Sequence, residues 1–469
     1  MLLLDILSST SNPYLGIVTY LILPVAAGAG AGLMFLGVAW ERRRRKRHPG
    51  LTLTPLPSFD LNMPRQRTIA AGLLAFMSLA VILTSVTSYR AYNFSESVTF
   101  CGLACHQVMN PEYTAYLHSP HARVACVACH IGPGASWFVR SKITGAYQVY
   151  AVTFNKYPRP ISTPIKNLRP AQETCEQCHW PAKFFGAQQR TFHHFLSDEK
   201  NSPWDIQMLV RIGGGDPKTG AVSGIHWHMN IKNEIFYLAA DEKRETIPWV
   251  RVVAPSGHVT DYRSTENPLS AEQIAKAKPR RMDCMDCHNR PSHVFRAPDR
   301  AVEESFGAGR LDPALPYLKR EAVRLLTETY ASQTQAAQAI GAGLDTFYKK
   351  SYPAIYRDKE AAIRKAIGEL QQLYSTNFFP EMHADWRAYP THIGHMTSDG
   401  CFRCHDGLHQ SKEGKVITKD CSACHTILAQ GPPPEAALGR LQAQLFRHPV
   451  DVGVDVKELK CGQCHAATN

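Results

Sequence analysis

The chain has 469 residues, a formal net charge of +12 and 14 cysteines, and 44% of its residues are hydrophobic. This length is enough for two to four domains. Much of the positive charge is concentrated in residues 41–67, which contain eight Lys or Arg residues but only two acidic residues, Glu41 and Asp60. Because basic and aromatic residues are not interleaved and no nucleic-acid motif is present, the charge does not indicate a nucleic-acid-binding protein.

Two apolar runs near the N-terminus predict a membrane anchor. Residues 14–40 and 68–87 are each long enough to cross a bilayer. The basic loop 41–67 between them favours the cytoplasmic side. A cleaved signal peptide is the alternative for the first run, but the charged cluster follows that run instead of preceding it. We therefore expect residues 1–92 to form a two-helix transmembrane hairpin in a bacterial inner membrane, with the rest of the chain in the periplasm.

All 14 cysteines fall into seven pairs, each followed directly by a histidine. Six pairs have the spacing C-x-x-C-H, and the first pair has the variant spacing C-x-x-x-C-H. In chain order the motifs are Cys101, Cys105 and His106; Cys126, Cys129 and His130; Cys175, Cys178 and His179; Cys284, Cys287 and His288; Cys401, Cys404 and His405; Cys421, Cys424 and His425; and Cys461, Cys464 and His465.

This spacing predicts covalent attachment of haem. Two thiols reach the two vinyl groups of one porphyrin, and the adjacent histidine then binds the iron as an axial ligand. Zinc sites, thioredoxin-like dithiols and structural disulfides also use paired cysteines, but none of them requires a histidine directly after the second cysteine. We therefore expect seven covalently bound haem c groups as cofactors, with all 14 cysteines as their thioether ligands.

The rest of the chain is expected to be organised around these motifs. Residues 93–180 hold three motifs, residues 181–283 have the alternating and β-branched pattern of a small β insert, and residues 284–298 hold the fourth motif. Residues 299–376 have the period of a helical spacer, and residues 377–469 hold the last three motifs. The predicted fold class is a mainly α multihaem cytochrome c with little regular structure around the haems.

Histidines outside the motifs are expected to supply the second axial ligand of each low-spin iron. The pair His226 and His228 could bind a separate metal on one strand face, but a single haem ligand is favoured. Each candidate could instead have a surface or structural role. The distal candidates are His118, His121, His293, His392, His395, His409, His448 and His228.

The first motif differs from the others in its ligand choices. Met109 follows His106 by three residues. A methionine ligand raises the potential of an iron, whereas the default role of a methionine is packing. His106 and Met109 therefore stay as alternatives for the first haem.

The run CGLACHQVMNPEYTAYLHSPHARVACVACH, which directly follows an apolar helix, resembles the start of the NapC/NirT family of quinol-oxidising multihaem cytochromes. The region of Trp137 and Lys142 is similar too, and the resemblance covers about residues 68–180 plus the fourth motif. It implies an anchored periplasmic cytochrome that takes electrons from menaquinol or ubiquinol at its first haem. It also implies Met109 as an iron ligand and Lys142 as part of the quinol pocket.

The chain departs from that family in three respects. Its anchor has two predicted helices instead of one, and it carries seven motifs instead of four or five. An Asp that some relatives use near the first haem has no counterpart here, because no acidic residue occurs between Cys126 and Glu173, and Gln148 is the nearby polar residue. The arrangement is most similar to the seven-haem inner-membrane cytochromes of metal-respiring bacteria, which send quinol electrons toward extracellular acceptors.

These observations predict a quinol dehydrogenase of anaerobic or extracellular respiration, primarily an electron-transfer protein, with Lys142 and Gln148 as its tentative quinol site. The expected partners are membrane quinol, periplasmic c-type cytochromes and the lipid bilayer, with no nucleic acid. The alternative is a non-enzymatic electron-transfer subunit of a larger respiratory complex. A nitrite- or hydroxylamine-type reductase is less favoured, because it needs an open iron and the chain has ample histidine to close every site.

Overall fold

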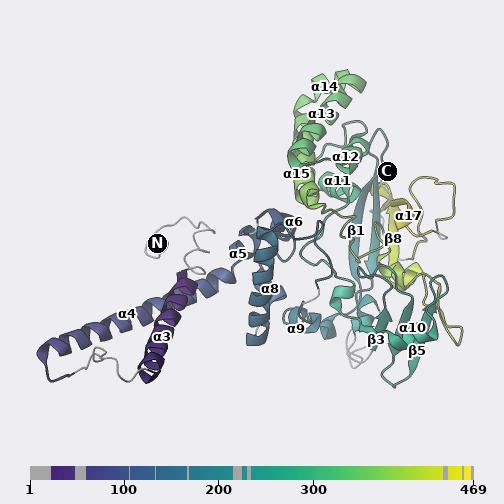
Figure 1. The fold of residues 1–469 in the computed structure, drawn as a ribbon. Helices are drawn as coiled ribbons and strands as arrows, with labels where there is room; N and C mark the ends of the chain where they lie inside the picture. Colours follow the sequence, from purple (N-terminus) through teal and green to yellow (C-terminus); the bar gives the residue numbers. More distant parts are fainter. Residues whose placement is uncertain are drawn as a thin grey trace. The chain divides into compact units, whose positions relative to one another are not determined.

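The computed structural model describes residues 23–47, 60–104, 106–132, 134–165, 168–214, 224–229, 234–436, 442–456 and 459–465 (Figure 1). The chain divides into two compact units. The first unit comprises Met1–Asn110 with Ala125–Val127, and the second comprises Pro111–Val124 with Ala128–Asn469.

The first unit contains helices α3 (Leu23–Arg47), α4 (Pro64–Ser95) and α5 (Val98–Leu103). Helix α4 begins at a proline, whose fixed φ suits the first turn of a helix. Among the described residues, α4 alone is long and apolar enough to cross a membrane. The other expected span, residues 14–40, begins outside the described residues. Its described part belongs to α3, which continues through the basic cluster to Arg47, where a loop was expected.

Two antiparallel sheets form much of the second unit. The first has the strand order β1-β2-β8, and the second has the order β6-β3-β4-β5-β7. The strands are β1 (Gln188–Phe195), β2 (Pro203–Val210), β3 (Glu234–Leu238), β4 (Trp249–Val253), β5 (Val259–Ser264), β6 (Arg280–Arg281), β7 (His409–Ser411) and β8 (His425–Gly431).

The sheets differ from the small insert that was expected within residues 181–283. Strands β1 to β6 lie there, but β2 pairs with β8 and β5 pairs with β7, and both partners come from the C-terminal region. The protein is therefore a mixed helical and sheet structure in which strands tie the fifth and sixth motifs to the middle of the chain.

A helical layer fills the stretch that has helical period in the sequence. Helix α13 begins after the N-cap Ser332, whose hydroxyl accepts a hydrogen bond from the backbone of Gln335. Helices α13 and α15 pack side by side (Figure 1). The helices are α11 (Pro298–Gly307), α12 (Leu318–Thr327), α13 (Gln333–Ser351), α14 (Pro353–Asp358) and α15 (Glu360–Asn377). The fully buried stripe of α13 is Ala336, Ile340, Leu344 and Tyr348.

One buried carboxylate joins this helical layer to the first sheet. Glu303 on α11 accepts hydrogen bonds from the ring of His194 on β1 at 3.0 Å and from Lys319 on α12 at 2.5 Å. Burial raises the pKa of Glu303, but these two donors outweigh burial and hold the pKa below its usual value. A carboxylate with a lowered pKa stabilises the fold above its unfolded pKa and loses that effect as the pH falls.

We therefore expect the Glu303→Gln variant to be less stable than the unchanged protein at pH 7, by about 1–3 kcal/mol for the lost charge-assisted bonds. This difference should shrink as the pH falls below about 4, where the carboxylate becomes protonated. Thermal unfolding of both proteins, followed by far-ultraviolet circular dichroism across this range, measures it. A difference that does not change with pH would contradict the assignment.

Candidate functional site: histidine pairs at the cysteine motifs

Each described cysteine motif is folded as one helical turn. In the third, fourth, fifth and seventh motifs, the backbone N–H of the histidine donates to the carbonyl oxygen of the first cysteine, at 2.8 to 3.0 Å. Residues three and four apart share one face of a helix. The local fold therefore puts both thiols and the imidazole of a C-x-x-C-H motif on one side, as a covalently held porphyrin requires. The helical elements at these motifs are α7 (Cys126–His130), α9 (Ala171–Cys175), which ends at the first cysteine of the third motif, η4 (Cys284–Asp286), η6 (Gly400–Arg403), η7 (Cys421–Ala423) and α17 (Gly462–His465).

The second cysteines of the second and third motifs differ in their surroundings. Cys129 lies within α7 and is half-buried. Cys178 follows the end of α9 and is exposed, and its backbone N–H donates to the carbonyl oxygen of Cys175 at 3.1 Å. Neither Cys129 nor Cys178 is joined in a disulfide. The thioether bonds that the sequence predicts for these two cysteines, and for those of the other motifs, stay predictions.

Six of the seven motif histidines face a second histidine from elsewhere in the chain. The ring centroids in these pairs lie 5.8 to 6.4 Å apart. With the motif histidine first, the pairs are His130 with His293 at 6.2 Å, His179 with His121 at 6.1 Å, His288 with His226 at 6.4 Å, His405 with His228 at 5.8 Å, His425 with His395 at 6.2 Å and His465 with His448 at 6.3 Å.

This separation fits one metal ion between two imidazoles. A bond of about 2.0–2.1 Å from each ring nitrogen to a metal places the two centroids roughly 6 Å apart. The gap is too wide for a direct hydrogen bond between the nitrogens of the two rings. The residues present therefore fit a haem iron with one histidine above it and one below it.

Five of the six partner histidines are oriented by hydrogen bonds from Nδ1 to backbone carbonyl oxygens, and the exception is His395, whose Nδ1 is buried without such a bond. The Nδ1 of His226 donates to Ile212 at 2.6 Å, and the Nδ1 of His293 donates to Glu112 at 2.9 Å. Such a bond leaves the lone pair of Nε2 for a metal. The same arrangement holds for His121 with Pro291 at 3.3 Å, His228 with Ile225 at 2.8 Å and His448 with Val450 at 2.7 Å.

Burial also favours the metal-binding form of rings on both sides of these histidine pairs. Burial lowers the pKa of His130, His228 and His288 below the ordinary histidine value. Neutral imidazole is the form that binds a metal.

The turn η3 (Ile225–Met229) carries two of the partner histidines. Its backbone is fixed to the preceding segment, because the N–H of Ile225 donates to Arg211 at 2.8 Å and the N–H of His226 donates to Gly213 at 3.0 Å. A Cβ at Gly214 would collide with the backbone of His226. The glycines here therefore allow close approach of two chain segments, and they place His226 and His228 opposite two different motif histidines.

Three expected distal ligands are not paired with a motif histidine in the part of the chain that the structure describes. His392 is buried, with Nδ1 bonded to the carbonyl oxygen of Asp286 and Nε2 bonded to Glu245. Both ring nitrogens of His409 are occupied as well, by Asp406 and by the carbonyl oxygen of Ile247. These contacts assign both rings a structural role, contrary to the expectation.

His118, the third of these, is an exposed side chain whose Nδ1 lies 2.8 Å from the carbonyl oxygen of Thr114. Conversely, His226 was not among the distal candidates. The H-x-H pattern of residues 226–228 could have indicated it, because alternate residues in a tight turn can reach two irons, one on each side.

The first motif is described only in part. Cys105 and the side chain of His106 lie outside the described residues. Met109 is half-buried on α6 (His106–Leu117). The choice between His106 and Met109 as iron ligand stays a prediction.

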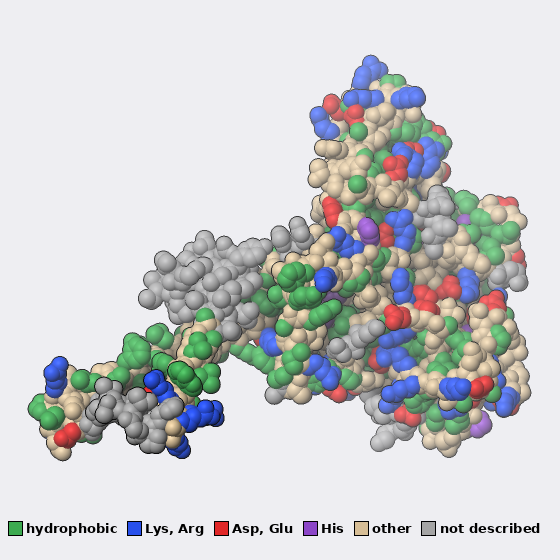
Figure 2. Space-filling view, in the orientation of Figure 1, with side chains coloured by type: hydrophobic (Ala, Val, Ile, Leu, Met, Phe, Trp, Pro, Cys, Tyr) green, Lys and Arg blue, Asp and Glu red, His purple; other side chains and the backbone are tan. Residues whose placement is uncertain are grey.

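The tentative quinol residues lie on α8 (Ala135–Thr153). Lys142 is half-buried with its ammonium 4.6 Å from the ring centroid of Phe138, and Gln148 is exposed. Six residues of helix place these two side chains about 120° apart around the axis, so the helix does not bring them to one face. Lys142 instead borders a stripe of exposed apolar side chains, Val139, Ile143, Tyr147 and Tyr150, and Figure 2 shows this hydrophobic surface over α8.

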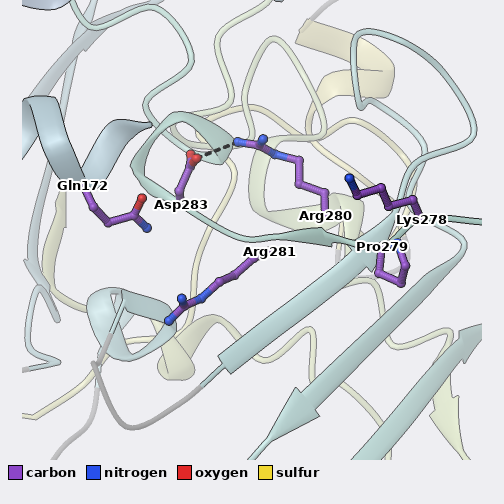
Figure 3. Close-up of a pocket in the computed structure, with 6 residues that line it drawn as sticks. All are labelled: Gln172, Lys278, Pro279, Arg280, Arg281 and Asp283. Atoms are coloured by element: carbon purple, nitrogen blue, oxygen red, sulfur yellow. Dashed lines mark hydrogen bonds and ion pairs between the residues drawn. The ribbon is translucent and has the colours of Figure 1, made fainter. Parts of the chain in front are cut away.

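A basic cavity of about 410 Å³ lies between the third and fourth motifs (Figure 3). Gln172 lines it from α9, and Arg280 and Asp283 line it on the other side, joined by an ion pair of 2.8 Å. Lys278 and Arg281 complete its positive wall. Positive side chains beside two attachment motifs suit the carboxylate groups of haem.

The other uses of paired cysteines gain no support from this geometry. Within the described ranges, no group of three or more His, Cys, Asp or Glu side chains could hold a metal ion, and no described cysteine is joined in a disulfide. The pattern is one of histidine pairs beside cysteine pairs, not of zinc clusters or disulfides.

Comparison with known proteins points to the same chemistry. The model of the NapC/NirT cytochrome c family, N-terminal region, matches residues 63–166. The cytochrome c-type protein ImcH of Geobacter sulfurreducens is 43% identical over 466 residues, which are 99% of this chain and 90% of that protein. The cytochrome c-type protein NrfH of Wolinella succinogenes is 26% identical over 153 residues, 31% of this chain and 86% of that protein. No solved structure matches the chain significantly.

Proposed function

Because the chain belongs to the NapC/NirT family of c-type cytochromes, we propose that it is a quinol dehydrogenase that passes electrons through seven haem sites to periplasmic carriers. The observation that carries this proposal is the set of six histidine pairs. An iron with two histidine ligands has no open position for a substrate, which favours electron transfer over reduction of a small molecule at these sites.

In this proposal each haem c is held by the two thiols of its motif and by the motif histidine. Once attached, it supplies an iron that accepts and releases one electron. The partner histidines close the irons of the second to seventh motifs, in chain order His293, His121, His226, His228, His395 and His448. His106 or Met109 serves the first.

The membrane end of the proposal rests on the first unit. Helix α4 is apolar enough to span the bilayer and leads directly into α5, which carries Cys101. We propose residues 14–40 as the second span, with the basic loop 41–67 on the cytoplasmic side and the haem-bearing region in the periplasm. This orientation agrees with the chemistry, since haem is attached to apocytochromes outside the cytoplasm.

The apolar stripe on α8 supports a quinol site at Lys142. A quinol carries an apolar tail and a polar head group with two hydroxyls. Val139, Ile143 and Tyr147 are 55%, 69% and 64% exposed and offer apolar contact, while the ammonium of Lys142 at the edge of the stripe can donate to a head-group oxygen. Gln148 lies on another face of the helix and is the weaker member of the proposed site.

The second candidate is an electron-transfer subunit that receives electrons from another protein of a respiratory complex. The histidine pairs favour it equally, because both functions need closed irons. Only the source of the electrons separates the two.

Stopped-flow reduction of the detergent-solubilised holoprotein by a menaquinol analogue separates them. We expect rapid reduction of several haems, read as haem absorbance, and inhibition by a quinol-site blocker. Lys142→Ala should slow quinol-driven reduction by about tenfold or more, equivalent to about 1.4 kcal/mol, while reduction by dithionite stays unchanged. Lys276→Ala, on helix α10 (Ala271–Lys276), removes a lysine that is 76% exposed and lies outside α8, and it is the matched control.

Lys142→Arg, which keeps the positive donor, should recover part of the rate. Equal rates for Lys142→Ala and Lys276→Ala would reject the site at Lys142. No reduction of the unchanged protein by quinol, with full reduction by dithionite, would favour the subunit that is fed by another protein.

A further inference from the structure

We infer that the seven attachment motifs lie in single file, in the order of the sequence, so that each haem site lies beside the next one and electrons pass along the file. The inference concerns the path inside the proposed electron-transfer function, and it rests on contacts between consecutive motifs.

The file begins within the first unit. The thiols of Cys101 in the first motif and Cys126 in the second motif share a hydrogen bond, and both residues belong to that unit.

In the second unit, the second and third motifs meet in two ways. The Nδ1 of His121, which faces the third motif, bonds the carbonyl oxygen of Pro291, two residues before His293, which faces the second motif. The cysteines of these motifs are also neighbours, because Cys129 is close enough to Cys175 to interact with it electrostatically. The second and third sites therefore adjoin on the cysteine side as well as on the side of the partner histidines.

The third and fourth motifs are in direct contact. Helix α9, which ends at Cys175, packs against η4, which begins at Cys284, and the thiols of these two cysteines share a hydrogen bond. The basic cavity of Figure 3 opens beside this contact. Two porphyrins attached here would have adjoining edges, because each is bonded to one of the two touching thiols.

The fourth and fifth motifs are held together twice. On the cysteine side, the buried guanidinium of Arg403 in the fifth motif donates to the carbonyl oxygen of Asp286 in the fourth motif at 2.6 Å. On the opposite side, His226 faces the fourth motif and His228 faces the fifth, and both stand on the single turn η3. The fourth and fifth sites are therefore joined both on the cysteine side and on the side of the partner histidines.

The fifth and sixth motifs meet through an aromatic contact. The ring of His395, which faces the sixth motif, stacks on Phe402, which lies between the cysteines of the fifth motif, with centroids 4.6 Å apart. Neighbouring cysteines of the two motifs, Cys401 and Cys424, are close enough to interact electrostatically. His395 therefore reaches from one motif to the next.

The sixth and seventh motifs meet at their first cysteines, because Cys461 is close enough to Cys421 to interact with it electrostatically. The seventh motif also packs against the segment that leads into the fifth motif: Lys460 pairs with Asp399 at 2.7 Å, and a Cβ placed on Gly462 would lie 3.7 Å from the backbone of Ser398. The seventh motif therefore lies at the end of the file, beside the sixth motif and close to the flank of the fifth, and we expect electrons to enter it from the sixth.

The first test is independent of any electron donor. Crystals of the mature holoprotein, with diffraction recorded at the iron absorption edge, locate the irons directly. We expect each iron to have as nearest neighbours only the irons of the preceding and following motifs, with the fourth and fifth bridged by η3. An iron whose nearest neighbour belongs to a non-consecutive motif would overturn the single file.

The second test removes one site at a time. A double variant of the sixth motif, Cys421→Ala with Cys424→Ala, should cut the seventh haem off from its supply of electrons. Quinol should then reduce the haems of the first five motifs rapidly, with the seventh reduced only slowly. The matched control, Cys461→Ala with Cys464→Ala, removes the terminal site and should leave all six remaining haems rapidly reducible.

Rapid reduction of all six haems in both variants contradicts the single file. If quinol fails to reduce even the unchanged protein, the proposed function is rejected, while the iron positions still decide the order of the sites. Dithionite titration of each variant verifies the number of haems present.

Discussion

Replacing His226 with alanine is expected to convert one haem of the holoprotein from low spin to high spin. The ring of His226 lies 6.4 Å from the ring of His288 in the fourth motif, and its Nδ1 donates to the carbonyl oxygen of Ile212. An alanine removes the ligand and opens one face of that iron. The opened iron should bind an added ligand such as imidazole, which the unchanged protein should not bind.

The matched control for this experiment is His392→Ala. His392 is also a buried histidine, and it is anchored to Asp286 in the fourth motif, but both of its ring nitrogens are bonded to protein atoms. Its loss should lower stability by about 1–3 kcal/mol for the unsatisfied groups left behind, while every iron stays low spin. Electron paramagnetic resonance of the ferric proteins measures the spin states. A high-spin signal in His392→Ala, or none in His226→Ala, would reverse the ligand assignment.

The contrast between these two histidines shows what sequence distance can and cannot predict. The motif turns were predictable, since three- and four-residue spacings define a helical face regardless of context. The second histidine at each haem site is instead brought there by the packing of segments that are distant in the sequence. His392 lies nine residues before Cys401, yet the packing of Glu245 and Asp286 occupies its ring. His228 lies far from Cys401 in sequence but faces its motif.

The sheets show the same limit. Alternating residues in the middle of the chain indicated strands, and strands β1 to β5 form there. The same pattern could not indicate that β8 would complete one sheet, because strand pairing depends on contacts between distant segments. Strand β8 begins at His425, so the pairing of β2 with β8 also helps to position the sixth motif. Local periodicity therefore predicts the elements, and the haem sites depend on how those elements pair.

The other large effect is expected at Asp286, which lies between the cysteines of the fourth motif. Its side chain is only 2% exposed. The carboxylate accepts hydrogen bonds from the hydroxyl of Tyr237 at 2.6 Å, from Arg244 at 2.8 Å and from Arg280 at 2.9 Å. Strand β3, the segment after it and strand β6 therefore converge on one buried charge beside the attachment site.

Asp286→Asn keeps the shape of the side chain but removes the charge that both guanidinium groups share. Loss of the buried charge removes the carboxylate partner of Arg244 and leaves Arg280 with Asp283 alone, and we expect a loss of about 3 kcal/mol in the free energy of unfolding. The matched control is Asp261→Asn. Asp261 also bonds an arginine, Arg251 at 2.7 Å, but these side chains are 31% and 41% exposed, so its loss should cost less than about 1 kcal/mol.

Urea unfolding of the holoproteins, followed by circular dichroism in the haem absorption region, compares the three proteins. Because Asp286 also holds the fourth motif against Arg403 through its backbone, the variant should keep its haems and lose stability without loss of attachment. Equal midpoints for Asp286→Asn and Asp261→Asn would mean that the buried carboxylate is not what joins the sheet to the fourth motif. A larger effect at Asp286 would show that this charge, placed inside a haem motif, also stabilises the surrounding fold.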